Sequence, residues 1–316
     1  MLQQTRVEQG LPYYNAFTST LPTIYDFERA GEDTILQMWE GLGYYSRARN
    51  MIKAAKIVVN NYDGKFPDNY DDLIQLPGIG PYSAAAISSI CFDEARAVVD
   101  GNVVRVLSRV YGIADDFKST AGRKIFSEQA QKLMDKDLPG DYNQAIMEFG
   151  ARHCTPRKPL CTTCIFTKDC VANRMDMQDQ WPTKRTKSKR RHRTLHYFIF
   201  LRDGNILLQK RNGRDIYKGL YQLPLIENDR RPSMALILKT MCGYGLEHII
   251  SVDKQAIELD QTLSHQEIHA RFYIVKDGWI WDDQQDDMEL VLVKNLSNFA
   301  MPRILRRFFT NFELLT

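Results

Sequence analysis

The spacing of hydrophobic and polar positions changes near the middle of the chain. Up to residue 151, apolar residues recur at intervals of three and four, the spacing of amphipathic helices, and short turns rich in glycine and proline separate them. Helices are predicted at 48–59, 69–75, 83–90, 102–110, 123–134 and 142–151. The helical pattern is already present at residue 1, with no capping residue before it.

After residue 195, apolar and polar residues alternate and predict strands instead. Residues 197–201 and 206–209 flank the turn Asp203-Gly204-Asn205, and together they predict a β-hairpin. A further strand is expected at 268–275, and helices are expected at 233–242 and 302–309. The second half of the chain is therefore predicted to be an α+β domain.

The predicted fold has two domains, an all-α domain over residues 1–175 and an α+β domain over residues 195–316. A chain of 316 residues is long enough to bury a core in each. Residues 176–194 are expected to link them. Within this linker, residues 183–193 read TKRTKSKRRHR, with seven Lys or Arg and no acid. Such a run is typical of a flexible linker and would also suit contact with DNA.

The overall composition is less informative than the local charge. The formal net charge is only +3, which by itself does not indicate a nucleic-acid partner. No apolar run is long enough to span a bilayer, and the N-terminus lacks the pattern of a signal peptide. We therefore expect a soluble cytoplasmic protein that does not act at a membrane, with its six cysteines kept as thiols.

Residues 76–83, LPGIGPYS, predict the turn of a helix-hairpin-helix over residues 69–92. Gly78 and Gly80 allow a tight turn whose backbone N–H groups point outward, and a helix of small residues follows. N–H groups at the start of a helix bind phosphate without any side chain. The motif alone is equally consistent with an ordinary turn.

A second short motif, Val99-Asp100-Gly101-Asn102, places one carboxylate just before a predicted helix. The helix dipole stabilises the charge of a carboxylate at that position. A phosphate site next to a fixed negative charge suggests chemistry on the sugar of a nucleotide. The alternative is that Asp100 and Asn102 only cap the backbone at the start of the helix.

Four cysteines fall within seventeen residues, with the spacing C-x6-C-x2-C-x5-C: Cys154, Cys161, Cys164 and Cys170. Four thiolates so close in sequence favour a soft metal centre, and both zinc and a [4Fe-4S] cluster satisfy this chemistry. Between the first two cysteines, Arg157 and Lys158 are flanked by prolines. This loop suits a phosphate contact, although a solvated surface loop would have the same charges.

These motifs together resemble the helix-hairpin-helix DNA glycosylase superfamily: LPGIGPYSAAAI, VDGNVVRVLSR, GLGYYSRARN and the four-cysteine spacing. Within that superfamily, the opening MLQQT, the DGN motif and the added C-terminal domain are similar to the adenine DNA glycosylase (MutY) family. The resemblance covers nearly the whole chain. It implies a helical glycosylase domain followed by a Nudix-like domain.

The resemblance further implies a base excision repair enzyme that hydrolyses the N-glycosidic bond of adenine. Its expected substrate is double-stranded DNA with adenine opposite 8-oxoguanine or guanine, bound by a monomer at the nucleoid. Asp100 matches the carboxylate that stabilises the oxocarbenium-like sugar, Asn102 an amide that orients groups there, and Tyr82 a hydroxyl-bearing residue of the active site. Glycoside chemistry and the need to flip the base out of the duplex are consistent with these roles.

The other roles implied by the resemblance concern DNA and metal binding. Gln4 and Tyr44 match residues that wedge into the base stack. The four cysteines match the ligands of a [4Fe-4S] cluster that shapes a DNA-binding loop. In the Nudix-like domain, Ser264 and His265 match a Phe-Ser-His pattern that contacts 8-oxoguanine, although Leu263 stands in place of the phenylalanine.

The chain departs from the family pattern at its start. The family reads Glu-x-Met-Leu-Gln-Gln-Thr, and its Glu, the general acid that protonates adenine, would lie two residues before Met1. Glu8 lies about two and a half helical turns further on and is no substitute. We therefore expect the polypeptide as printed to bind DNA weakly and to release little or no adenine.

Three other functions are weaker matches. An endonuclease III-type lyase would need a lysine where Tyr82 stands, because a phenol forms no Schiff base. A non-catalytic mismatch-binding protein fits the missing Glu but not the presence of Asp100. A Nudix hydrolase needs an acidic helix to hold metal, and the candidate helix at 233–242 contains no acid.

Overall fold

The computed structural model describes residues 1–183, 190–276, 278–282 and 285–311. These residues form two compact units, Met1–Ile52 together with Ser188–Thr316, and Lys53–Lys187. Residues 184–189, which make up much of the predicted basic linker, lie outside the described residues. Among the helices in the described ranges, none has the length and apolar character that crossing a membrane requires.

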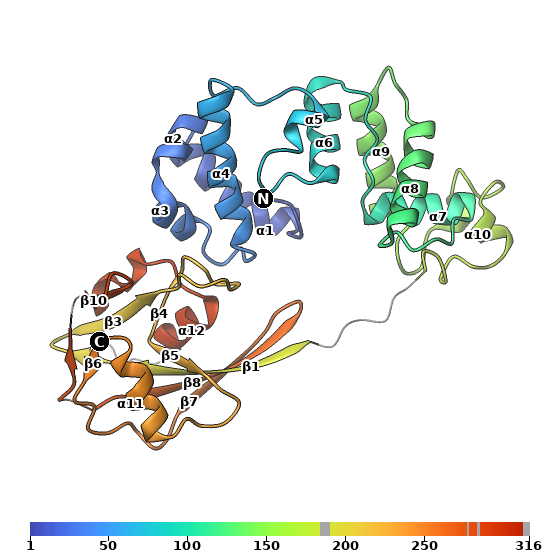
Figure 1. Cartoon of the computed structure of the whole chain (residues 1–316). Helices are drawn as coiled ribbons and strands as arrows, with labels where there is room; N and C mark the ends of the chain where they lie inside the picture. Colours follow the sequence, from blue (N-terminus) through green and yellow to red (C-terminus); the bar gives the residue numbers. More distant parts are fainter. Residues whose placement is uncertain (184–189, 277, 283–284, 312–316) are drawn as a thin grey trace. The chain divides into compact units, whose positions relative to one another are not determined.

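The unit Lys53–Lys187 is helical, and its α-helices are labelled in Figure 1. After α4 (Ser46–Asn61), which enters it from the other unit, it contains α5 (Tyr70–Leu73), α6 (Pro81–Phe92), α7 (Gly101–Tyr111), α8 (Thr120–Leu133), α9 (Pro139–Arg152), the short 3-10 helix η1 (Cys161–Thr163) and α10 (Val171–Arg174). The helices predicted from residue 48 onward are therefore confirmed, with ends shifted by a few residues.

Helix α7 is held in place by its apolar face. Val103 and Leu107 are fully buried and pack in one cluster with Phe126 and Ala130 of α8. Asp100 caps the start of the helix, and Gly112 ends it in the left-handed region at a φ of 71°. Burial of this face fixes the direction of α7, and hence the position of Asp100 at its N-terminus.

The other unit begins with three helices, α1 (Val7–Thr20), α2 (Ile24–Arg29) and α3 (Gly31–Met38). The expectation that the helix is already present at residue 1 is wrong, because α1 begins at Val7 and the backbone at Gln4 has a φ of 57°. The Arg47 guanidinium donates to the carbonyl oxygens of Met1, at 2.7 Å, and Gln3. These carbonyl oxygens therefore accept hydrogen bonds from Arg47 and not from the backbone N–H groups of a helix.

The C-terminal part of this unit contains three sheets. The largest has the strand order β5-β1-β8-β7, the second has the order β10-β3-β2 with β4 paired to β3, and the third pairs β6 with β9. Their strands are β1 (Arg191–Ile199), β2 (Leu201–Arg202), β3 (Asn205–Lys210), β4 (Tyr221–Gln222), β5 (Leu225–Glu227), β6 (Leu246–Glu247), β7 (Ile257–Thr262), β8 (Gln266–Ile274), β9 (Ile280–Trp281) and β10 (Met288–Leu292).

The α+β prediction for this part is confirmed, including α11 (Met234–Cys242) and α12 (Arg303–Asn311). The pairing of the strands and several short elements were not predicted. Strand β1 pairs parallel to β8, from Arg191 opposite Gln266 to Ile199 opposite Ile274, and β7 pairs antiparallel to β8. The short 3-10 helix η2 (Val293–Asn298) leads to α12. The parallel pairing places the start of β1 next to the turn between β7 and β8.

The N-terminal helices belong to the same compact unit as the sheets, so this division does not follow the domain boundary expected at residue 175. The contacts are polar: Lys210 Nζ lies 2.5 Å from Asp33 Oδ1, and Gln37 Nε2 donates to the carbonyl oxygen of Ser297 at 3.0 Å. Glu40 pairs with Arg306 of α12. These contacts join segments that are about 180 to 260 residues apart in sequence. A local sequence pattern therefore cannot predict that the N-terminal helices group with the sheets.

Candidate functional site

The predicted hairpin is present between α5 and α6. Asn69 caps α5, the Ile79 N–H donates to the Leu76 carbonyl oxygen at 3.0 Å, and α6 begins at Pro81 after the extended Gly80. Gly78 has a φ of 86°, which a residue with a Cβ adopts only with strain. The turn therefore brings the chain into the start of α6, where backbone N–H groups point along the helix axis.

Tyr82, the second residue of α6, lies close to Asp100. Its side chain is 41% exposed, and its hydroxyl donates to Met147 Sδ of α9 at 3.5 Å. Partial burial, and then the negative charge of Asp100, raise the pKa of this phenol. Helices α6 and α7, which begin at the hairpin and at the DGN motif, both pack against α9.

The Asp100 carboxylate accepts three hydrogen bonds from the helix that it caps. Oδ1 accepts from the backbone N–H groups of Asn102 at 2.8 Å and Val103 at 2.7 Å, and Oδ2 accepts from Asn102 Nδ2 at 2.8 Å. The carboxylate is half-buried. Hydrogen bonds from N–H donors and the positive end of the helix dipole both stabilise its negative charge.

Asn102 does not cap the backbone, which was the alternative considered for it. Its side chain bridges Asp100 and Arg105, because Oδ1 accepts from Arg105 Nη2 at 2.9 Å. Arg105 in turn donates to the carbonyl oxygens of Gly150 and Cys154, each at 2.6 Å. A chain of hydrogen bonds therefore runs from the carboxylate to the first cysteine of the four.

The four cysteine side chains line one cavity of about 30 Å³. Arg109, which is 2% exposed, donates from Nη1 to Cys154 Sγ at 3.3 Å, and the Phe166 N–H approaches Cys164 Sγ at 3.4 Å. Burial, followed by the neighbouring cysteines, raises the pKa of the Cys161 thiol. Soft donors that converge beside a cation suit an anionic metal–thiolate centre.

The described residues contain no group of three or more His, Cys, Asp or Glu side chains arranged to hold a single metal ion. Arg157 and Lys158, on the loop that follows Cys154, have exposed side chains, and Lys158 has a φ of 50°. The Thr155 hydroxyl donates to the Arg157 carbonyl oxygen at 2.9 Å and so ties the loop together. The loop therefore presents two cations to solvent.

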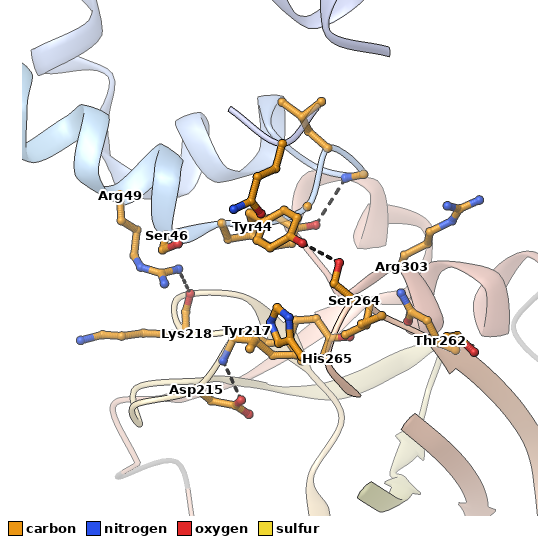
Figure 2. Close-up of a pocket in the computed structure, with 18 of the residues that line it drawn as sticks. Tyr44, Ser46, Arg49, Asp215, Tyr217, Lys218, Thr262, Ser264, His265 and Arg303 are labelled. Atoms are coloured by element: carbon orange, nitrogen blue, oxygen red, sulfur yellow. Dashed lines mark hydrogen bonds between the residues drawn. The ribbon is translucent and has the colours of Figure 1, made fainter. Parts of the chain in front are cut away.

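The other compact unit contains a larger cavity of about 1000 Å³, shown in Figure 2. Gln4, Tyr44, Ser264 and His265 all line it. Tyr44 Oη and Ser264 Oγ are 2.5 Å apart, and the ring centres of Tyr44 and His265 are 6.2 Å apart. The structure thus brings together the two residues predicted to wedge into the base stack and the two predicted to contact 8-oxoguanine.

Cations also line this cavity, and the sequence analysis did not single them out as a group: Arg49, Arg214, Lys218, Arg303 and Arg307. They come from α4, from the β3–β4 connection and from α12, so no run of basic residues reveals them. Figure 2 shows Arg49 reaching the Lys218 backbone, a hydrogen bond of 2.6 Å to its carbonyl oxygen. Such a lining suits a phosphate-bearing ligand.

The predicted site residues are divided between the two compact units. Asp100, Asn102, Tyr82, the hairpin glycines and the cysteines belong to Lys53–Lys187, whereas the four residues of the large cavity belong to the other unit. The residues expected at the reacting sugar and at the metal centre thus lie in one unit, and the residues expected at the opposite base lie in the other.

Comparison with known proteins decides the family. Residues 1–134 match the model of the HhH-GPD superfamily base excision DNA repair proteins, and residues 196–311 match the NUDIX domain. The chain is 30% identical over 315 residues to the adenine DNA glycosylase of Buchnera aphidicola subspecies Acyrthosiphon pisum, covering 99% of this chain and 88% of that protein.

The chain belongs to the adenine DNA glycosylase family.

The resemblance seen in the sequence is therefore confirmed, and this adenine DNA glycosylase family member is an enzyme of base excision repair that acts on DNA. It is 45% identical over 181 residues to the human adenine DNA glycosylase, covering 57% of this chain and 33% of the human protein. A thermostable thymine-DNA glycosylase has a similar structure, with a TM-score of 0.51 and 29% identity over 55% of this chain and 80% of that chain.

Proposed function

We propose that the protein removes adenine from double-stranded DNA where it lies opposite 8-oxoguanine or guanine. The observation that supports this most directly is the Asp100 carboxylate, which accepts three N–H hydrogen bonds at the start of α7. Cleavage of the N-glycosidic bond leaves positive charge on the sugar, and a fixed carboxylate next to the sugar stabilises that charge. One water completes the hydrolysis, since the adenine leaves with a proton and the sugar carbon gains a hydroxyl.

The surrounding residues have distinct roles in this proposal. The N–H groups of the hairpin at Gly78 and Gly80 hold a phosphate of the strand that carries the adenine. Tyr82 places a hydroxyl at the edge of the site. Asn102, fixed between Asp100 and Arg105, keeps the carboxylate oriented toward the sugar. The adenine itself reaches this site only after it is flipped out of the duplex.

We assign recognition of the opposite base to the large cavity. Gln4 and Tyr44 enter the base stack from one side, and Ser264 and His265 contact the edge of the 8-oxoguanine from the other. The cations that line the cavity then neutralise phosphates of the same strand. Bases from duplex DNA combine a π-face with a nearby phosphate, which matches aromatic rings surrounded by cations.

We propose that Cys154, Cys161, Cys164 and Cys170 hold a [4Fe-4S] cluster. When bound, such a cluster crosslinks its four thiolates and so fixes the loop between them. Arg109 donates a charge-assisted hydrogen bond to the Cys154 sulfur, and Arg157 and Lys158 contact DNA phosphates from the loop. We further propose that the protein acts as a monomer and, because chromosomal DNA is its substrate, at the nucleoid in the cytoplasm.

The test uses two DNA ligands and one substitution. Asp100→Asn removes the charge but leaves a residue that caps a helix equally well. The polypeptide as printed is expected to release little adenine, so the main readout is binding; any single-turnover release that the unchanged chain shows on an 8-oxoguanine:adenine duplex should fall to background in this variant. We also expect the substitution to weaken binding of a duplex carrying a cationic pyrrolidine in place of the sugar by up to roughly 1000-fold, because opposite charges about 4 Å apart attract by about 4 kcal/mol.

Asp135→Asn is the matched control, because Asp135 also accepts backbone N–H groups, those of Asp137 and Leu138, but lies outside the site. It should change neither measurement. The proposal is contradicted if Asp100→Asn binds the cationic sugar mimic as tightly as the unchanged chain. Selective binding of the mispair that Asp100→Asn leaves unchanged, together with unchanged affinity for the cationic sugar mimic, would instead indicate a non-catalytic mismatch-binding protein.

A further inference from the structure

Two turns of the sheet-containing region line the large cavity, and they come from different sheets. The first is the β3–β4 connection, where the N–H groups of Lys218 and Gly219 donate to the carbonyl oxygens of Asp215 and Arg211. The second is the β7–β8 turn, which holds Ser264 and His265. Their separation decides the width of the cavity between them.

One buried guanidinium bonds to both turns. Arg193 of β1, whose side chain is 4% exposed, donates from Nη1 to Asp215 Oδ1 at 2.9 Å and to Gln266 Oε1 at 3.2 Å. Asp215 lies in the first turn, and Gln266 immediately follows the second. No other side chain among those described donates to both residues.

The rest of the Arg193 environment holds the guanidinium in a single orientation. Nε and Nη2 donate to the two carboxylate oxygens of Glu227 at 2.8 and 2.7 Å, and Nη2 donates to Asp215 Oδ2 at 3.1 Å. Arg211 also pairs with Asp215, and Arg191 also pairs with Glu227. The buried Arg193 guanidinium therefore has two carboxylate partners that compensate its charge.

The Gln266 contact controls the second turn through its backbone. The Gln266 carbonyl oxygen accepts from the Leu263 N–H at 2.8 Å and closes the turn, and the Arg191 N–H donates to the His265 carbonyl oxygen at 3.0 Å. A shift of Gln266 therefore moves Ser264 and His265 directly. Contacts that read a base depend on placement within about 0.5 Å.

We propose that Arg193 is a positioning residue for selection of the base opposite the adenine. It fixes the distance between the β3–β4 connection and the Ser264–His265 turn, and so sets the fit of an 8-oxoguanine base in the cavity. This inference rests on the proposed role of the cavity. This role requires the planar guanidinium of arginine. A lysine ammonium is a point charge and does not bond to both Asp215 and Gln266 in a fixed geometry.

The experiment compares equilibrium binding of duplexes that differ only in the base opposite one adenine, 8-oxoguanine or thymine. The ratio of the two dissociation constants measures selectivity, whereas binding of the thymine duplex measures general DNA affinity. In Arg193→Lys and in Gln266→Ala we expect the ratio to fall about tenfold, with affinity for the thymine duplex unchanged.

Arg191→Gln is the matched control, because Arg191 lies two residues away on β1 and pairs with the same Glu227, but its side chain is 68% exposed and contacts neither turn. The ratio of the two dissociation constants for this variant should remain within about twofold of the ratio for the unchanged chain. Thermal melting establishes which variants are folded. If Arg193→Lys is unfolded, Gln266→Ala decides the question, because it removes a single hydrogen bond from a partly exposed residue.

The inference is overturned if folded Gln266→Ala keeps full selectivity, or if affinity for both duplexes falls by the same factor, since that result would mark a purely structural role. A different outcome tests the proposed function itself. If the unchanged chain binds the two duplexes equally, the assignment of the cavity to the opposite base fails, whatever the variants do.

Discussion

The phenolic oxygen of Tyr44 lies 2.5 Å from the hydroxyl oxygen of Ser264. These residues are 220 positions apart in sequence, one before α4 and the other in the β7–β8 turn. Tyr44 has a φ of 49°, and the Arg47 guanidinium lies 5.6 Å from the centre of its ring. Two residues that are proposed to act at the opposite base thus form a hydrogen bond with each other.

A double-mutant cycle measures this contact. Because the pair is exposed, we expect Tyr44→Phe and Ser264→Ala each to lower the free energy of unfolding by no more than about 1 kcal/mol. The double variant should be no less stable than the worse single variant, which gives a coupling of about 0.5–1 kcal/mol in urea denaturation. Tyr14→Phe, an exposed tyrosine of α1, is the control and should show no coupling with Ser264→Ala.

The hydrogen-bonded chain from Asp100 to Cys154 predicts an effect of Arg105, a residue behind the carboxylate. Arg105→Lys keeps the charge but loses the simultaneous bonds to Asn102, Gly150 and Cys154. We expect affinity for the duplex with a cationic sugar mimic to fall about tenfold, because Asn102 no longer fixes the carboxylate. Arg123→Lys is the control, because Arg123 is exposed, and it should not change this affinity. An equal loss of affinity in both variants would contradict a role for the hydrogen-bonded chain.

Arg109 predicts a link between a buried cation and retention of the metal centre. Its guanidinium donates to Cys154 Sγ and to the carbonyl oxygens of Thr155 and Trp181. Arg109→Leu leaves buried carbonyls without donors, at a cost of about 1–3 kcal/mol each, and removes the positive charge next to the thiolates. We expect the purified variant to contain less iron per chain, as measured by elemental analysis.

Arg152→Leu is the control for this prediction, because the Arg152 side chain is 80% exposed and pairs only with Glu148 among the acids described on α9. Its iron content should match that of the unchanged chain. Equal iron content in Arg109→Leu would show that the Arg109–Cys154 contact is not needed to hold the metal.

His196 predicts how stability depends on pH. It is fully buried in β1, and burial, reinforced by the charges of Arg271, His269 and Arg231, lowers its pKa below the ordinary 6.5. Between the folded and unfolded pKa values, the unfolded chain binds more protons than the folded one. Stability from this group is therefore complete above about pH 6.5 and decreases as the pH falls below it.

Urea denaturation at several pH values between 5 and 7.5 measures this dependence. His196→Gln, which has no titrating group at this position, should lose less stability on acidification than the unchanged chain. His248→Asn is the control, because His248 is exposed and asparagine tolerates its φ of 56°. The prediction is wrong if His196→Gln and the unchanged chain have parallel pH profiles.

Sequence patterns were reliable where the deciding interactions are local. Asp100 caps α7 because its side chain reaches backbone N–H groups two and three residues away. Gly78 adopts the positive φ that the turn between α5 and α6 requires. The spacing of four cysteines fixes a loop of seventeen residues whose sulfurs line one cavity. In each case the chain is too short between the partners to place them elsewhere.

Residues 1–6 show where such local patterns fail. Their composition suits a helix, but Arg47 takes up their carbonyl groups from another segment. The same holds for the parallel pairing of β1 with β8, which joins strands about 75 residues apart. Hydrogen bonds to distant segments override local propensity, and a single sequence contains no periodic signal of them.

The sequence by itself determined the helical and α+β character of the two halves, the DGN and hairpin motifs, and the family to which the chain belongs. Only the tertiary structure decided that Asn102 bridges Asp100 to Arg105, that five separate cations line one cavity, and that Arg193 joins the two turns beside it. A motif can be recognised in the sequence because its residues interact with the backbone only a few positions away. The contacts of Asn102, of the five cations and of Arg193 instead depend on how the packed helices and strands bring distant side chains together.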